Sequence, residues 1–372
     1  ALACLGVFGV HFQQMTGVDA DGGPFSLSRL MLNGNTGVCL FFLLSGFLLS
    51  LPVWSANPET RNQKLLQGYV RRRTMRILPA YLVCLAALVL VTRHWQTAGE
   101  RLDVLLHGML LHNYRDSTFY SINAPFWTVA VQVQFYTVFG MLVSLLVRLR
   151  TVSDRVLLLV TGALIPAAWL LHMLLLSEFD GFPSPPNGDG FYGQSPVLTR
   201  SLIAHLPIFV LGTMTAWCHV KCSRSSRNCI SASAADLLFV GSAFLLLLIL
   251  ATPLDDILQV PGGRYNLPFV PLLLAGMILL VPRSRAVMRC LDVPPLRGIG
   301  MISYGIYLFH VPCLKLAAAV LHSGGTSPET APILFAVSGG LLSIAVASLS
   351  WFLLERHLLA RAGSSRVGIH SE

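Results

Sequence analysis

The chain has 372 residues, of which 54% are hydrophobic and only 12% are charged, and its formal net charge is +9. Soluble globular proteins carry about 25% charged residues, so this composition excludes an ordinary soluble enzyme. The basic residues form short clusters between long apolar runs, which is typical of a membrane protein and excludes a nucleic-acid-binding surface. The cysteines and histidines show no spacing typical of zinc sites, so we expect neither a metal ion nor a tightly bound cofactor.

Ten apolar runs follow one another along the chain. They cover residues 1–15, 36–54, 77–94, 126–149, 156–176, 200–219, 235–252, 266–282, 299–321 and 331–354. Because a transmembrane helix needs about 20 apolar residues, these runs predict an all-α, polytopic membrane helix bundle with about ten transmembrane helices. The first run begins at Ala1 without an initiator methionine, so we expect a truncated first helix and a chain that is a fragment.

A shorter apolar run, Leu102–His112, contains His107 and His112 and is too brief to cross a bilayer. It predicts a re-entrant or interfacial helix. Residues 362–372 are polar and are expected to be disordered. We therefore expect one membrane domain, residues 1–361, within which any chemistry takes place.

The distribution of Lys and Arg predicts the orientation of the chain in the membrane. If the loop at 55–76 faces the cytoplasm and the runs alternate from there, most of the 26 Lys and Arg residues fall on the cytoplasmic side. An excess of positive charge on the inner loops sets the orientation of membrane proteins. We expect a multi-pass protein of the plasma (inner) membrane with both ends in the cytoplasm.

A dense cluster of positive charge precedes the third apolar run. Arg71, Arg72, Arg73 and Arg76 lie within six positions, in what we interpret as a basic loop between two membrane helices. Pro79 is expected to end or kink the helix that follows. Such a cluster either anchors the topology or binds an anion, and the spacing alone leaves both interpretations open.

His11 is an ionisable residue inside the first apolar run. Such a residue is costly in a membrane and is by default a functional candidate. Near neutral pH an imidazole can take a proton from a hydroxyl group. For a lone helical histidine, a packed structural role is an equally good interpretation.

Several short motifs resemble those of the integral-membrane acyltransferase 3 family. They are Gly37-Val38, Phe41-Phe42, Ser45-Gly46-Phe47, the segment from Arg72 to Tyr81, Phe126-Trp127 through Phe135-Tyr136, Ser303 through His310, and Glu355-Arg356. Each is weak alone, but they occur in the family's order and span nearly the whole chain. The resemblance implies transfer of an acyl group, often acetyl, from a cytoplasmic donor such as acyl-CoA to a carbohydrate, lipid or natural product.

The same resemblance implies roles for the basic residues and for His11. His11 matches an essential histidine of the family, whose basic partner would lie before Ala1. Arg72, Arg73 and Arg76 match a motif linked to the acyl donor, and guanidinium groups bind phosphates such as those of coenzyme A with two parallel hydrogen bonds. Because coenzyme A is too charged to cross a bilayer, its site should open to the cytoplasm.

Gln132 departs from the family pattern. In the motif that begins at Trp127, the family has a glutamate where this chain has Gln132. A glutamate could orient a histidine or carry a proton, whereas glutamine can hydrogen-bond but cannot ionise. Gln132 and Tyr136 are four residues apart and share a helix face, so we interpret both, together with His11, as catalytic candidates.

Attack on a thioester builds negative charge on an oxygen atom, which needs a hydrogen-bond donor nearby. Candidates for this contact, or for contact with the acceptor, are Ser45, Trp127, Tyr304 and His310, although most aromatic residues in these runs serve packing. No Gly-x-Ser-x-Gly motif is present, so direct histidine-assisted transfer is favoured over a covalent serine intermediate.

We therefore predict a membrane O-acyltransferase that lies in the lipid bilayer and uses acyl-CoA, expected to be acetyl-CoA, as its co-substrate. A transporter or flippase of a lipid-linked or small anionic substrate is the first alternative. It should show internal repeats and helices broken near the membrane centre, and the sequence shows neither. A catalytically degenerate family member is the second alternative, because of Gln132.

Overall fold

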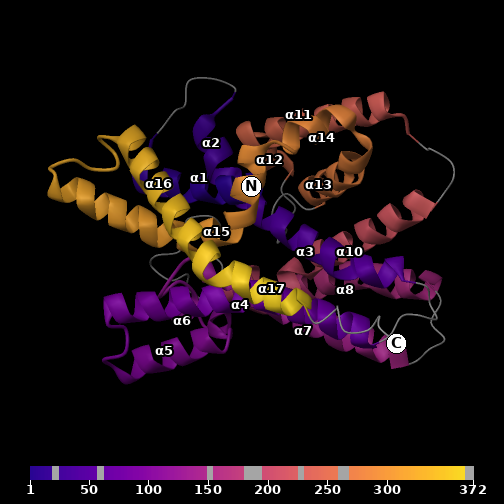
Figure 1. Cartoon of the computed structure of the whole chain (residues 1–372), viewed down its shortest axis with the longest axis horizontal. Helices are drawn as coiled ribbons and strands as arrows, with labels where there is room; N and C mark the ends of the chain where they lie inside the picture. Colours follow the sequence, from indigo (N-terminus) through magenta and orange to yellow (C-terminus); the bar gives the residue numbers. More distant parts are fainter. Residues whose placement is uncertain are drawn as a thin grey trace. The chain divides into compact units, whose positions relative to one another are not determined.

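A computed structural model of the chain describes residues 1–18, 25–56, 63–148, 154–179, 195–224, 230–258 and 268–364. Within these ranges every regular element is a helix, which confirms the all-α fold. The chain divides into two compact units, labelled by element in Figure 1. Unit 1 comprises Ala1–Arg61 and Leu146–Gly298, and unit 2 comprises Asn62–Leu145 and Ile299–Glu372.

The helices confirm a polytopic membrane protein. Among the described residues, eight helical segments are long and apolar enough to span a membrane, and a ninth results if one sharply bent pair counts as a single span. Several of them turn most of their apolar surface outward; in Leu158–Ser177, for example, only 17% of the most apolar stretch is buried inside the protein. A lipid-facing helix does this, because hydrocarbon and not water surrounds it. The first helix, with 15 residues, is shorter than a span.

Unit 1 is built around two long helices that pack backbone against backbone. Its elements are α1 (Leu2–Thr16), α2 (Leu27–Leu32), η1 (Asn33–Asn35), α3 (Thr36–Ser55), α8 (Asp154–Phe179), α9 (Pro196–Thr199), α10 (Leu202–Arg224), α11 (Ala232–Ala251), α12 (Leu254–Leu258), α13 (Phe269–Leu280), η4 (Val281–Arg283) and α14 (Arg285–Leu291). Gly46 of α3 lies against the carbonyl oxygen of Phe209, and Gly212 of α10 lies against that of Leu43. A side chain at either glycine would collide with the backbone of the facing helix, so small residues permit this close approach.

The predicted run at 266–282 ends in a sharp bend. The segments Phe269–Arg283 and Arg285–Leu291 meet at an angle of 98°. Pro282 lies in the short 3-10 turn η4, and Ser284 caps the next helix by accepting a hydrogen bond from the backbone N–H of Val287 at 3.2 Å. Asp236 of α11 accepts hydrogen bonds from the Ser284 hydroxyl and from the backbone of the bend, which fixes its position. The bend was not predicted.

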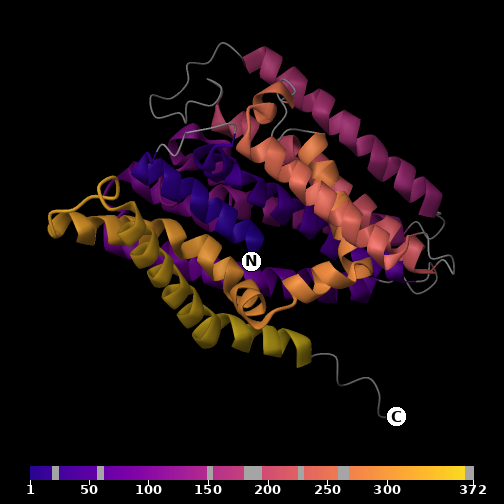
Figure 2. The same cartoon turned by 90° about the horizontal axis from the view of Figure 1, so that it is seen from above.

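Unit 2 holds the basic helix and the short helix. Its elements are α4 (Gln63–Thr92), α5 (Ala98–Gly108), η3 (His112–Tyr114), α6 (Asp116–Phe119), most of α7 (Phe126–Arg148), most of α15 (Pro294–Ser323), α16 (Pro332–Ser350), η5 (Trp351–Glu355) and α17 (Arg356–Ser364). Figure 2 shows α16 crossing α15, where a Cβ added at Gly305 would lie 3.0 Å from the side chain of Ala347.

The interpretation of the arginine cluster as a loop is wrong. The helix α4 begins at Gln63 and runs without interruption through the arginines and through Pro79. The residues that precede Pro79 include several Gln, Lys, Leu and Arg, which all favour helix. The arginines therefore have the fixed spacing of a helix, and Pro79 does not end it.

Candidate active site

The predicted site residues are divided between the two units. His11 and Ser45 belong to unit 1, whereas Arg72, Arg73, Arg76, Trp127, Gln132, Tyr136, Tyr304 and His310 belong to unit 2. Each group is described within its own unit below.

The arginines of α4 differ in exposure. Arg71 is exposed, while Arg72, Arg73 and Arg76 are half-buried. The charge of Arg76 interacts with two groups on other elements of unit 2, the carboxylate of Glu355 and the phenol of Tyr136. Since residues three and four apart lie on one side of a helix, Arg72 and Arg73 flank the same side of α4 as Arg76.

Gln132 and Tyr136 share a face of α7, as predicted. The Gln132 amide Nε2 donates a hydrogen bond to the Tyr136 hydroxyl oxygen at 2.8 Å. An ionised glutamate has no hydrogen to donate, so at this position it would instead accept the phenol's hydrogen. The glutamine therefore preserves the contact and reverses its direction.

Glu355 is a site residue whose role the sequence reasoning missed. It ends the π-helical turn η5 and is only 1% exposed. The Ser350 hydroxyl donates to its Oε1 at 2.9 Å, whereas its buried Oε2 has no hydrogen-bond partner among the described residues. Its charge acts on Arg76 and on Tyr304. A buried carboxylate is costly unless paired, and π-helical turns occur frequently at functional sites. We therefore group Glu355 with Arg76 and Tyr136 as one polar cluster, defined by the action of their charges on Arg76 and not by hydrogen bonds.

The signal that could have found Glu355 is present in the sequence. It is an acidic residue at the end of the last apolar run and belongs to the Glu355-Arg356 motif. An intramembrane acid is a functional candidate by default. The sequence has no signal, however, for the π-helical turn that directs this side chain inward.

Tyr304, Trp127 and His310 lie along the contact between α15 and its neighbours in unit 2. The Tyr304 hydroxyl donates to the backbone carbonyl of Ile77 in α4 at 2.8 Å. The His310 Nδ1 lies 2.7 Å from the carbonyl oxygen of Tyr307, and because a carbonyl only accepts, Nδ1 carries the hydrogen. Trp127 and His310 are both buried. Tyr304 therefore joins α15 to α4, whereas the Nδ1 of His310 bonds to a carbonyl of its own helix.

In unit 1, His11 has the hydrogen-bonding state of a base. Its Nδ1 lies 3.0 Å from the Oε1 of Gln14, one turn further along α1. Because an amide oxygen only accepts, Nδ1 carries the hydrogen and the neutral ring has its lone pair on Nε2. The ring is half-buried, and Ser45 of α3 is buried.

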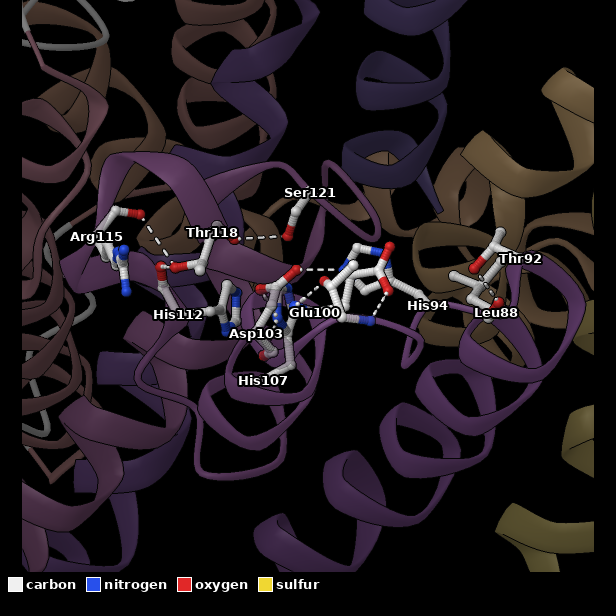
Figure 3. A network of polar contacts seen from close by, with 11 residues as sticks. Leu88, Thr92, His94, Glu100, Asp103, His107, His112, Arg115, Thr118 and Ser121 are labelled. Carbon is white, nitrogen blue, oxygen red and sulfur yellow. Dashed lines mark hydrogen bonds and ion pairs between the residues drawn. The ribbon is translucent and has the colours of Figure 1, made fainter.

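A second polar cluster of unit 2 surrounds the short helix α5 (Figure 3). Asp103 and His107 face each other on this helix, with 3.0 Å between Oδ1 and Nδ1. The other oxygen of Asp103 lies 2.7 Å from Nε2 of His94. The rings of His107 and His112 stack in parallel, 3.9 Å apart. The sequence singled out both histidines but not Asp103, although the spacing of 103 and 107 places them on one helix face.

The surroundings set the ionisation of this second cluster. Burial disfavours the carboxylate of Asp103, but hydrogen bonds from His107, Ser121 and His94 outweigh it and lower its pKa. Burial and the neighbouring charge of His107 lower the pKa of His112 to about 3, so this ring is neutral at physiological pH. Across the described ranges, no group of three or more His, Cys, Asp or Glu side chains could hold a metal ion.

The fold and the polar clusters together define a polytopic helical membrane protein in which ionisable side chains are buried between helices. Residues 1–352 match the model of the acyltransferase 3 family, which describes an acyltransferase domain. The chain belongs to this family.

Its relatives include named acyl-transferring proteins. It is 27% identical over 305 residues to the peptidoglycan O-acetyltransferase OatA of Listeria monocytogenes, which covers 77% of this chain and 46% of the relative. It is 26% identical over 368 residues to the putative peptidoglycan O-acetyltransferase YrhL of Bacillus subtilis, covering 91% and 53%. It is 25% identical over 341 residues to the putative membrane-bound transacylase BcsY of Komagataeibacter xylinus, covering 87% and 76%. The chain thus spans about half the length of the first two relatives, and no solved structure matches it.

Proposed function

We propose that the chain is a membrane O-acyltransferase that moves an acetyl group from acetyl-CoA to a hydroxyl group of a carbohydrate. The observation that carries this proposal is the group of half-buried arginines on one side of α4, Arg72, Arg73 and Arg76, at the donor motif of a chain from an acyltransferase family. The names of two relatives, both peptidoglycan O-acetyltransferases, favour acetyl as the group and a glycan as the acceptor.

The donor would bind through its phosphates to the arginines of α4. Arg72, Arg73 and Arg76 are half-buried. Compared with exposed arginines, they therefore lose less side-chain entropy when they bind a phosphate, and water screens their charge less. The negative charge of Glu355 opposes the positive charge of Arg76, so the net positive charge of this part of α4 comes mainly from Arg72 and Arg73. The donor is charged and made in the cytoplasm, so this helix end should face the cytoplasm.

The acyl transfer would use His11 as general base. Its Nε2 takes the proton from the acceptor hydroxyl while the hydroxyl oxygen attacks the thioester carbonyl. The C–S bond then breaks, the acyl group forms an ester, and the proton passes to the departing thiolate. The oxyanion needs a hydrogen-bond donor, and the Ser45 hydroxyl is the predicted candidate in the same unit as His11.

Although Gln132 replaces the family glutamate, unit 2 still contains a buried carboxylate, that of Glu355. Glu355 is buried and interacts with Tyr304, and both Glu355 and Tyr136 interact with Arg76. We propose that Glu355 provides the negative charge of this cluster and that Gln132 orients Tyr136. On this account the chain is an active enzyme and not a degenerate member.

A transporter of anionic substrates is the second candidate, because one pair of segments in unit 1 is bent by 98°. Broken helices are typical of transporters. The two functions are separated by one assay. The purified protein in lipid vesicles is supplied with radiolabelled acetyl-CoA and with uncross-linked peptidoglycan strands, and label is counted in the strands. Labelled strands support the transferase. Unlabelled strands, together with uptake of acetyl-CoA or of inorganic phosphate by the vesicles, would support the transporter.

We further propose a plasma-membrane location with both chain ends in the cytoplasm. In an otherwise cysteine-free background, the variant Ser323→Cys places a thiol after α15 on the expected outer side, and Cys290 alone provides an exposed thiol on the expected inner side. In intact cells an impermeant thiol reagent should label the first and not the second. The opposite labelling would reverse the orientation and contradict the cytoplasmic donor site.

A further inference from the structure

The short helix α5 buries its polar side and exposes its apolar side. Asp103 and His107 are its buried residues, while Leu105 is 57% exposed. An amphipathic helix of a soluble protein does the opposite. In a membrane protein, ionisable side chains that face the protein interior are costly and mark functional sites. The arrangement of α5 therefore indicates a function for this pair that the proposed active site does not include.

The geometry of the pair gives His107 the properties of an oriented base. Its Nδ1 lies 3.0 Å from the Asp103 carboxylate and 3.0 Å from the Asp103 carbonyl oxygen. The carbonyl oxygen accepts the Nδ1 hydrogen, so the neutral ring has its lone pair on Nε2. The nearby Asp103 carboxylate oxygen makes an ion pair and has no hydrogen bond of its own among the described residues, so its charge can stabilise a positive charge on the ring. The Nε2 of His107 is buried, and the described residues offer it no hydrogen-bond partner.

The elements around His107 supply few other charges. From α4, the Tyr81 hydroxyl donates to the backbone carbonyl of His107 at 2.9 Å. From η3, the neutral ring of His112 covers one face of the imidazole. From α7 comes only the ring of Phe126, with 6.0 Å between ring centroids. The carboxylate of Asp103 is therefore the group that can stabilise a positive charge on His107.

One side of the cluster reaches the surface. His94 contacts Asp103 and is 25% exposed, and Glu100 lies 3.8 Å from its other ring nitrogen. Figure 3 shows His94, Asp103, His107 and His112 in one row, with His94 at one end. The row connects a fully buried imidazole, 0% exposed, with a partly exposed one. The contact of His94 with Asp103 therefore links the buried pair to the protein surface.

We propose that His107, held by Asp103, is a second general base of this protein, which accepts the proton of an O–H group bound at its Nε2. The inference rests on the proposed function, because acyl transfer supplies the thioester. The oxygen attacks the thioester carbonyl as Nε2 takes its hydrogen, the C–S bond breaks, and His107 returns the proton to the thiolate sulfur. The O–H group belongs to a water molecule, because His11 takes the proton of the acceptor in the proposed function, so the reaction at His107 is hydrolysis of the thioester.

The test is the substitution His107→Gln, assayed in vesicles with radiolabelled acetyl-CoA and peptidoglycan strands. Labelled strands report transfer, and labelled acetate reports hydrolysis. We expect kcat for release of labelled acetate to fall roughly 10²–10⁴-fold, with labelling of the strands retained and the KM for acetyl-CoA changed by less than about twofold. Loss of strand labelling with acetate release unchanged would overturn the inference. The matched control is His322→Gln, because the exposed His322 has the same hydrogen bond to the carbonyl four residues earlier, at 2.7 Å, outside the cluster.

The outcomes separate this inference from the proposed function. A wild-type protein that forms neither product would overturn the proposed function, and this inference with it. Wild-type turnover that His107→Gln leaves unchanged in both products would overturn the inference alone. The control variant should retain the activity of the wild type, and an equal loss in the control would also contradict a specific role for His107.

A second variant decides the matter if His107→Gln does not fold. Asp103→Asn preserves shape and removes the charge that stabilises an imidazolium at His107. The acidic limb of the pH profile of kcat/KM should therefore move to lower pH, together with a lower plateau rate. A purely structural role of Asp103 would change thermal stability and leave the acidic limb in place. An unshifted limb would overturn the inference.

Discussion

The two units differ in how their central helices meet. In unit 1, α3 and α10 meet through Gly46 and Gly212, and backbone lies directly on backbone. In unit 2, side chains reach across to backbone carbonyls, as Tyr304 does to Ile77 between α15 and α4. Glycine contacts make a close apolar interface, whereas buried polar groups are costly and persist where they have a use. We infer from this difference that the central contact of unit 1 is structural and that most of the polar site residues belong to unit 2.

His11 is the exception that can break this division, because it lies in unit 1. We expect His11→Ala to slow acetyl transfer roughly 10²–10⁴-fold, the usual contribution of a positioned base, with little change in donor binding. Single-turnover transfer and coenzyme A binding are measured on the same preparation. A folded variant that turns over normally would remove the catalytic role from unit 1. Gln14→Ala, which removes the amide that contacts His11 Nδ1, should lose much less activity.

The donor site in unit 2 gives the next largest effect. The double variant Arg72→Ala, Arg73→Ala should weaken coenzyme A binding by about 1.5–3 kcal/mol for each charged hydrogen bond lost. Lysine at both positions should restore only part of this, because it lacks the planar fork. Titration calorimetry measures the affinity, and the exposed Arg71→Ala is the control on the same turn. Equal affinities in the double variant and the control would reduce the cluster to a topology signal.

The glycine interface of unit 1 makes a stability prediction. A Cβ at Gly212 would lie 2.9 Å from the backbone nitrogen of Phe47 and even closer to the carbonyl oxygen of Leu43. Backbone cannot move aside as a side chain can, so Gly212→Ala should destabilise the protein by about 1–3 kcal/mol. Thermal unfolding in detergent measures this.

Two other glycines sharpen the comparison. Gly241→Ala in α11 adds a Cβ with no atom within 4 Å, and should be stabilising by up to about 1 kcal/mol. Gly339→Ala in unit 2 meets the Cδ2 atom of Leu314 at 2.6 Å, and this flexible side chain can turn away. We therefore expect a smaller loss there than at Gly212. If Gly212 and Gly339 variants lose the same stability, the contrast between the two interiors is wrong.

The sequence was sufficient for the long helices and insufficient for the orientation of single side chains. A run of about 20 apolar residues in a membrane permits hardly any structure except a helix, which is why the runs and the helices agree. Helix propensity could also have placed the start of α4 before the arginines, but the charge cluster favoured a loop. The inward turn of Glu355 depends on the π-helical segment Trp351–Glu355, for which the sequence has no signal.

The site shows the same limit. The contact between Gln132 and Tyr136 follows from helix spacing and was predicted, and it is present at 2.8 Å. The pairing of Asp103 with His107 has the same spacing, but its importance depends on which side of α5 is buried. An apolar run with a few polar residues suggests that the polar ones face outward, and in α5 they face inward. Only the packing of unit 2 settles that direction.

The smallest expected effect concerns Gln132, where the chain departs from its family. If the family glutamate acts through its charge, Gln132→Glu should raise the transfer rate strongly. We expect instead a change of less than about threefold, because Glu355 already provides a buried carboxylate whose charge acts on Arg76. A carboxylate at the half-buried position 132 would be protonated or would destabilise the protein, since burial disfavours its charged form. Measuring kcat for Gln132→Glu, Glu355→Gln and the double variant tests this. If Gln132→Glu restores activity to Glu355→Gln, the two positions share one role. A large gain from Gln132→Glu alone would instead show that the natural glutamine holds the enzyme in a slow state.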